Sequence, residues 1–506
     1  MKKQLTVIAS ATAICSSAAI QPAVAIRFDD NHTVERWEAL ASVFRKYDAR
    51  FSCSIIPMYG EEKDPQWCQK ICQLESEGFE IMDHTPQHTT VTVTLPADDI
   101  RLEKLKNAPF VDHIYKNKIC IKCYPANSTF SQPFQVKIFD KNKVVATNKT
   151  PFKLARRMNF EINGKFYFLN RTKKPDVFEL VTLWEEDNVA LPDGVVTARR
   201  CLKERFELAD GGYDFLIQCS QEGFRKIGLK KMPRVWIQPG GNYPHLGIEK
   251  LSAALRKYNY ISASRSQNES MKGYLDPEFE DRRFSMRWGN FNLEKLKFEP
   301  QKTRIADTLA CRKVAIGSSH ITPARRDGKL KEYVAMYELL LPWLKANNIK
   351  VMTQGELAEH LRDTKIDPNE NIMPSLAKDI DENNRPDGYI WRRGCGSWDK
   401  PAETISLKGK GWLLKVNELC GLPKCRVRFA MEVQGRVHGK LTIQLIDSLK
   451  KPCGKFELPL NEFSQEWKSK EMEFDIPENC AALNFAITAD KPANCKVREL
   501  DLRAAD

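Results

Sequence analysis

Short apolar runs alternate with amphipathic segments along the first part of the chain. Residues 23–28 have the pattern of a buried strand, and residues 33–47 carry apolar side chains at helical spacing before a second apolar run at 51–57. A helix over 65–78 and a strand over 79–82 are expected to repeat this order. Strands that alternate with helices are typical of parallel β/α units, so the sequence predicts an α/β domain.

The pattern changes between residues 92 and 202. Short alternating stretches at 134–139, 160–168 and 177–183 are separated by Asn, Lys, Pro and Gly, which predicts a β-rich insertion. The strand and helix order then resumes. We expect helices at 214–227, 247–258 and 329–347, and strands at 234–238, 313–317 and 349–352.

Residues 367–374 have the composition of a linker, and alternating stretches beyond residue 376 predict a C-terminal β-sandwich. The expected organisation is therefore a discontinuous α/β domain (20–91 and 203–366), the β-rich insertion (92–202) and an all-β sandwich (376–506). A chain of 506 residues is too long for one core, which agrees with this division.

Charge adds little to this picture. The formal net charge is +13, but the 79 Lys and Arg are interspersed with 66 Asp and Glu and form no long basic block. Such a distribution is typical of a solvated surface, and we do not expect a nucleic-acid partner.

The first 19 residues resemble a secretory signal peptide. Lys2 and Lys3 precede an apolar run at 5–14 and several small residues. The run is too short to span a membrane, and cleavage after Ala19 is preferred because cleavage after Ala25 would cut the first strand. We therefore expect an exported protein that is periplasmic, attached to the cell surface or secreted. Of 15 cysteines, 14 would remain, either in disulfides or as buried thiols.

Polar residues follow three of the predicted strands. Asp29 and Asp30 follow the first, His84 and His88 follow the strand at 79–82, and His320 follows the strand at 313–317. Taken singly, two adjacent acids are typical of a solvated loop or a helix cap, and two His four residues apart occur by chance. Together they lie where parallel β/α folds place their active sites, and imidazole is a preferred zinc ligand.

These residues resemble a known family. The order Phe-Asp-Asp, His-Thr-x-x-His, a Pro-Gly-Gly turn and a late strand ending in His is similar to the polysaccharide deacetylases with a NodB-homology domain, carbohydrate esterase family 4. The resemblance covers residues 23–90 and about 206–362. It implies a distorted (β/α) barrel that deacetylates an N- or O-acetylated glycan.

The resemblance also implies roles for individual residues. Asp30, His84 and His88 would hold a divalent metal, with zinc as the expected ion, and Asp29 would be the base that takes a proton from water. His320 would protonate the leaving amine or alcohol.

The later family motifs are less complete. The third motif normally carries an Arg that supports the catalytic acid, whereas this chain has Ile237 or Gln238 there, and Arg234 is a nearby candidate substitute. Gln238 and Gly240 are assigned to substrate binding. Trp288 either lines the substrate pocket as well or belongs to the core. The alternative to a deacetylase is therefore a non-catalytic or impaired glycan-binding protein on the same barrel. Asn31 replaces a family Gly, and Asn tolerates positive φ.

A second cation site is suggested before the predicted sandwich. Asp379, Asp381, Asn383 and Asp387 place oxygen side chains at intervals typical of calcium loops, although the usual Gly and the terminal Glu are missing. The segment is either a structural calcium site or an acidic turn. Several aromatic residues of the tail are either sugar-stacking or core residues: Tyr389, Trp391, Trp398, Trp412 and Trp467.

Overall fold

The computed structural model describes residues 21–125, 130–140, 142–155, 158–182, 191–201, 206–239, 246, 248–264, 274–275, 289–292, 297–320, 330–363, 367–447 and 451–505. The predicted signal peptide, Gly240 and Trp288 lie outside these ranges, so their assignments stay predictions.

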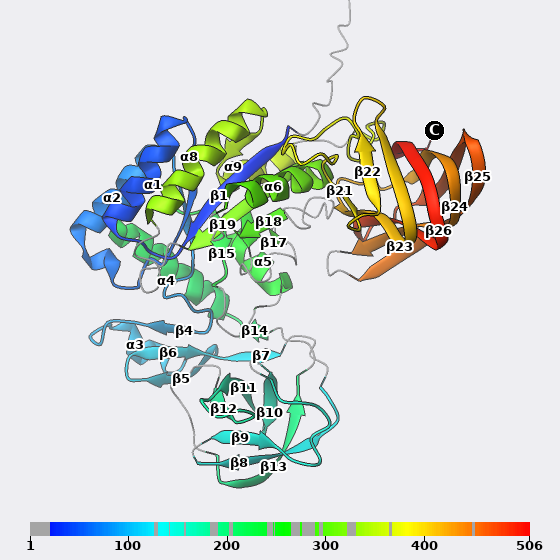
Figure 1. Cartoon of the computed structure of the whole chain (residues 1–506). Coiled ribbons are helices and arrows are strands. Elements are labelled where there is room, and N and C mark those ends of the chain that lie inside the picture. The colour runs from blue at the N-terminus through cyan, green and yellow to red at the C-terminus, as the bar shows by residue number, and fades with distance from the viewer. Residues whose placement is uncertain are drawn as a thin grey trace, which may run out of the picture.

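A nine-stranded, mostly parallel sheet forms the centre of the α/β domain (Figure 1). Its strands follow the order β17-β16-β15-β3-β2-β1-β19-β18, with β20 beside β1. Their bounds are β1 (Ala23–Asp29), β2 (Ser52–Ile55), β3 (Glu80–Asp83), β15 (Val235–Ile237), β16 (Ser262–Ser264), β17 (Tyr274–Leu275), β18 (Gly289–Asn292), β19 (Val314–His320) and β20 (Lys350–Met352). The α/β class is confirmed. Because β17 and β18 end the sheet in the described residues, its closure into a barrel stays a prediction.

Helices cover both faces of this sheet. They are α1 (Val34–Lys46), α2 (Pro65–Ser76), α4 (Gly212–Ile227), α5 (Ile248–Lys257), α6 (Phe298–Arg312), α8 (Leu330–Ala346) and α9 (Gln354–Asp363), and a short 3₁₀ turn, η1 (Glu61–Lys63), precedes α2. Along β1, Val24, Ile26 and Phe28 enter the core shared with α1, α2 and α8. Ala23 and Ala25 point to the opposite face, where they pack in a smaller core with α9.

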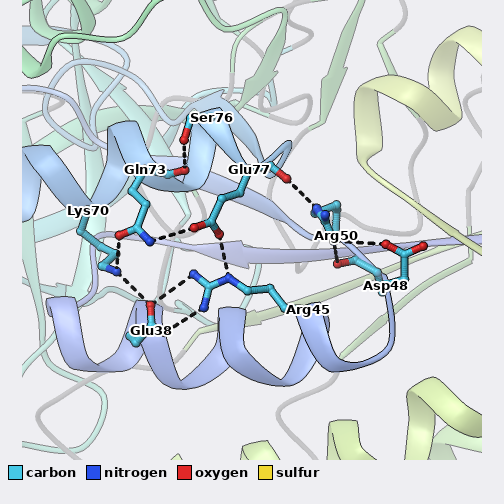
Figure 2. A network of polar contacts seen from close by, with 9 residues as sticks. Glu38, Arg45, Asp48, Arg50, Lys70, Gln73, Ser76 and Glu77 are labelled. Atoms are coloured by element: carbon cyan, nitrogen blue, oxygen red, sulfur yellow. Dashed lines mark hydrogen bonds and ion pairs between the residues drawn. The ribbon is translucent and has the colours of Figure 1, made fainter.

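Charged side chains join the outer surfaces of α1 and α2 (Figure 2). Arg45 Nε donates to Glu77 Oε2 at 2.8 Å, and Arg45 Nη1 donates to Glu38 Oε1 at 2.8 Å. Lys70 Nζ donates to the other oxygen of Glu38 at 2.9 Å. These pairs are partly exposed, so they contribute less to stability than the apolar core beneath them.

The insertion is β-rich, as predicted, and contains two small units. The first holds the sheet β4-β6-β5, with the pair β14-β7 beyond it, and the second is a closed barrel in the order β10-β11-β12-β9-β8-β13. The bounds are β4 (Thr92–Thr94), α3 (Arg101–Leu105), β5 (Val111–Tyr115), β6 (Lys118–Ile121), β7 (Cys123–Pro125), β8 (Phe134–Phe139), β9 (Lys143–Ala146), β10 (Asn159–Ile162), β11 (Lys165–Arg171), β12 (Phe178–Thr182), β13 (Gly194–Arg200) and β14 (Phe206–Leu208).

The expected single stretch at 160–168 is wrong. It is a hairpin between β10 and β11, turned by Asn163 and Gly164 with φ of 52° and 76°. Asn-Gly with both residues at positive φ is the preferred two-residue hairpin turn, so the turn residues override the apparent continuity of the apolar pattern.

The tail is all-β and forms a six-stranded sheet in the order β21-β23-β26-β24-β25, with β22 beside β23. Its strands are β21 (Tyr389–Trp391), β22 (Gly396–Asp399), β23 (Thr404–Leu419), β24 (Arg426–Asp447), β25 (Pro452–Asp475) and β26 (Cys480–Ala504). The alternating stretches at 426–433 and 440–446 are both parts of β24. The register shift beside Gly435, which has φ 99°, lets this strand continue through a bulge.

Two further expectations concern cysteines and membranes. No disulfide joins the fourteen cysteines among the described residues, which agrees with the thiol alternative. Within the same residues, no helix is both long and apolar enough to cross a membrane.

Candidate active site

The sheet brings the predicted acids and imidazoles to one edge. Asp29 ends β1 and lies in register with His320, the last residue of β19, so the two are neighbours across the parallel pair. Only β2 separates β1 from β3, which ends immediately before His84. The carboxyl ends of these strands therefore present Asp29, Asp30, His84 and His320 together.

Asp30 is the centre of this group. Its Oδ1 atom lies 3.3 Å from His84 Nε2 and 3.1 Å from His88 Nε2. Its other oxygen, Oδ2, lies 3.7 Å from His320 Nε2. The three residues assigned as metal ligands and His320 thus lie close together. Asp30, His84 and His88 each offer a ligand atom within 4.8 Å of the other two.

Contacts behind the ligands fix their orientation. His84 Nδ1 lies 2.9 Å from the carbonyl oxygen of Ile237 in β15, a contact that leaves Nε2 facing Asp30. The neighbouring Asp83 is fully buried and accepts hydrogen bonds from Ser220 Oγ and Tyr260 OH, both at 2.6 Å. The His84 loop is therefore anchored on α4 and on Tyr260, two residues before β16.

Three residues of the two ligand loops have left-handed backbone conformations. Asp30 has φ 73°, Thr85 has φ 67° and His88 has φ 58°. The expectation that Asn31 provides the positive φ of the first loop is wrong, since Asp30 adopts it. The Asn31 side chain instead ties this loop to β2, donating to Ile56 O at 3.0 Å and accepting from Ile56 N at 2.9 Å. Such backbone strain is typical of functional sites.

The most informative contact was not predicted from the sequence. Arg27 lies on β1 two residues before Asp29, and its Nε and Nη2 atoms reach Asp29 Oδ1 at 2.8 Å and Asp29 Oδ2 at 3.1 Å. The two side chains are 0% and 3% exposed. Arg27 Nη1 also donates to Gln354 Oε1 at 3.4 Å, at the start of α9. The Arg27 guanidinium therefore holds the Asp29 carboxylate in place.

The predicted substitute, Arg234, does not reach the site. Its Nη1 atom pairs with Glu359 Oε1 of α9 at 2.7 Å, and its side chain is 52% exposed. Alternation along β1 could have identified Arg27, because residues two apart on a strand share a face. A charged residue within an otherwise apolar buried strand was the available signal.

The surroundings keep both acids ionised. Burial raises the pKa of Asp29, but the Arg27 guanidinium, with His84 and His320, lowers this pKa below its usual value. Burial also raises the pKa of Asp30, while contacts with His84 and His88 hold it well below its usual range. Both carboxyl groups are therefore anions at neutral pH.

The donor set fits a borderline divalent metal such as zinc. Two imidazole nitrogens and one carboxylate oxygen converge on one point, and three protein ligands are typical of catalytic zinc sites. His84 Nε2 and Asp30 Oδ1 are both buried and make no hydrogen bond among the described residues, as expected of atoms that ligate an ion.

The predicted substrate-binding residues receive less support. Gln238 follows β15 and is fully buried, so its contact with a substrate stays a prediction. Gly240 and Trp288 lie outside the described residues.

Comparison with solved structures returns several deacetylases at low identity. The chain is similar to a peptidoglycan N-acetylglucosamine deacetylase (11% identity, 66% of this chain and 87% of the other, TM-score 0.31). It is also similar to the family 4 esterase domain of a multidomain xylanase from the hindgut metagenome of Trinervitermes trinervoides (7% identity, 68% and 92%, TM-score 0.30). A family 4 pseudoenzyme from Bacillus anthracis matches at 9% identity (67% and 66%, TM-score 0.29).

A shorter match also occurs among the solved structures. A carbohydrate-binding and xylanase fragment from Clostridium thermocellum covers 20% of this chain at 12% identity, with a TM-score of 0.18. No family model and no curated protein matches the sequence. The resemblance to NodB-type deacetylases noted from the motifs thus also appears among solved structures.

Proposed function

We propose that the protein is a metal-dependent deacetylase that hydrolyses N- or O-acetyl groups of an acetylated glycan. The observation that carries this proposal is the convergence of Asp30, His84 and His88 beside a buried Asp29 that Arg27 holds in place. A zinc ion bound by the first three residues would supply Lewis acidity and bring the pKa of water toward neutrality.

The remaining chemistry falls to residues of the chain. The Asp29 carboxylate, ionised and fixed by Arg27, would accept the proton of the attacking water. His320, beside Asp29 on the neighbouring strand β19, would donate a proton to the nitrogen or oxygen that leaves the acetyl group. Its side chain is 26% exposed, so it can exchange protons with solvent.

A paired measurement of metal content and acetate release tests the proposal. The full chain should contain about one zinc per molecule by elemental analysis and release acetate from acetylated oligosaccharides. His84→Ala should lose both metal and turnover, because it removes the ligand that Ile237 orients. His360→Ala, an imidazole on α9 rather than at the site, is the matched control and should keep both.

Two results would refute this function. If His84→Ala binds as much zinc as the wild type, His84 is not a metal ligand. Zinc binding by the wild type, without acetate release from chitin, peptidoglycan or xylan fragments, would favour the alternative of a glycan-binding protein. The predicted export signal places these extracellular polymers among the substrates to test first.

A further inference from the structure

We propose that Asp379, Asp381 and Asp387 form a calcium site at the junction between the α/β domain and the tail. This inference is independent of the proposed deacetylase function. One carboxylate oxygen from each residue lies within 4.8 Å of the other two. The segment was left open above as a calcium loop or an acidic turn.

Burial separates this cluster from an ordinary surface turn. Asp381 is 3% exposed and Asp387 is 4% exposed. Their Oδ1 atoms are buried and make no hydrogen bond to any described residue. An isolated buried carboxylate costs several kcal/mol unless a positive charge or hydrogen bonds compensate it. Two such atoms beside a third carboxylate therefore call for a cation.

The other carboxylate oxygens are already used to fix the loop. Asp379 accepts from the backbone nitrogens of Asn383 at 3.0 Å and Asn384 at 3.1 Å. Asp387 Oδ2 accepts from Ile380 N at 3.1 Å. Asp381 Oδ2 lies 2.6 Å from the Asn383 side-chain amide. These bonds hold the three side chains in place and leave the two Oδ1 atoms for a ligand.

The positive charges nearby are engaged elsewhere. Arg385 Nη2 pairs with Asp307 Oδ2 of α6 at 2.6 Å. Lys302 Nζ pairs with Glu299 at 3.0 Å and lies 4.0 Å from Glu382. Three carboxylate oxygens, one each from Asp379, Asp381 and Asp387, thus lie within 4.8 Å of one another. A bound cation would offset the electrostatic repulsion between these three carboxylates.

Oxygen donors identify the class of ion. Carboxylates without imidazole or thiolate suit hard cations, and Ca²⁺ accepts several carboxylate and carbonyl oxygens in flexible geometry. Mg²⁺ usually keeps several waters and binds through only one or two carboxylates. Three converging carboxylates therefore favour Ca²⁺. Asp387 also lines a cavity of about 720 Å³ beside α6, which gives an ion a route from solvent.

The position of the loop gives the ion a structural role. Trp343 Nε1 of α8 donates to Ile380 O at 3.2 Å, and Gly388 N donates to Asp307 Oδ1 of α6 at 2.8 Å. Strand β21 begins at the next residue, Tyr389. An ion bound between Asp379 and Asp387 would fix the segment that connects the helices of the α/β domain to the first strand of the tail.

Calcium titration of the full chain after chelator treatment tests the site. Ca²⁺ at about 0.01 to 5 mM should bind once per molecule by calorimetry and raise the thermal unfolding midpoint by several degrees. Asp381→Asn should weaken binding at least about tenfold, because it removes a charged ligand. Without calcium, this variant should unfold at or above the wild-type temperature, since it relieves the repulsion.

Two controls separate the site from other carboxylates and from the His84 site. Asp48→Asn, whose side chain is 97% exposed, should keep the wild-type calcium response. His84→Ala should keep it as well. The proposal is overturned if the wild type does not bind Ca²⁺, if Asp381→Asn and Asp387→Asn both bind it as wild type does, or if Mg²⁺ binds equally well.

Discussion

Removing the Arg27 guanidinium is the most direct test of how this site is built. Arg27→Met keeps the length and apolar volume of the side chain but deletes its charge. Asp29 would then be a carboxylate that is 3% exposed and has lost two contacts, at 2.8 and 3.1 Å. Removing one partner of a buried ion pair typically destabilises a protein by about 3–5 kcal/mol.

A surface pair supplies the matched control. Arg45 also joins carboxylates, but its side chain is 30% exposed, and those of Glu38 and Glu77 are 46% and 27% exposed. Arg45→Met should therefore cost no more than about 1 kcal/mol. Urea unfolding of both variants, followed by fluorescence and circular dichroism, measures this difference.

A double variant distinguishes lost pairing from lost packing. Arg27→Met with Asp29→Asn removes both charges, so it should be more stable than the sum of the two single effects by about 1–3 kcal/mol. Additivity within about 0.5 kcal/mol would refute the view that the pair is energetically coupled.

Turnover gives a second measurement of the same contact. Arg27→Lys keeps a positive charge but cannot form the two-atom contact with Asp29. If Arg27 positions the base, kcat should fall while KM for the glycan stays near the wild-type value. A change in KM alone would place Arg27 in substrate binding instead.

Three further variants test neighbouring parts of the structure. Asp29→Asn should retain zinc by elemental analysis but lose acetate release by at least about 100-fold, as expected for a general base. Glu80→Gln tests how the stability of the fold depends on pH. Burial raises the pKa of Glu80 from its ordinary value of 4.5 to about 7. Between these two pH values the folded protein keeps the Glu80 carboxyl protonated, whereas the unfolded chain has released that proton. The wild type should therefore lose up to about 3 kcal/mol of stability relative to Glu80→Gln between pH 4.5 and 8, and equal urea midpoints at both pH values would refute this. Tyr260→Phe removes the 2.6 Å hydrogen bond to buried Asp83 and should destabilise the fold by about 1–3 kcal/mol in urea, whereas an unchanged midpoint would mean that Asp83 finds another donor.

The strands and the residues that follow them could be predicted because the evidence is local. The apolar runs that became β1 and β3 are each followed directly by an acid or an imidazole, and parallel strands align their carboxyl ends. This alignment is enough to predict that these polar residues gather at one edge of the sheet. The ligand roles of Asp30, His84 and His88 came from the family resemblance.

Other features depend on long-range packing and were missed. Helices α6 and α9 were not predicted; in α6 the apolar positions, including Ile305 and Leu309, are separated by many polar residues. Arg234 was a reasonable partner for Asp29 by sequence proximity, yet its strand position directs it to Glu359. The Arg27 to Asp29 contact is different, because it is local and the two-residue spacing on β1 was enough to suggest it.

The missing Arg of the third family motif therefore has a structural explanation. Strand β15 contributes to the site through the carbonyl oxygen of Ile237, which contacts His84 and does not depend on the side chain at that position. The guanidinium comes instead from β1, the strand that also carries Asp29. The buried acid thus has a buried Arg partner on its own strand. Arg27→Met and Ile237→Val should accordingly differ, with only the first lowering turnover strongly.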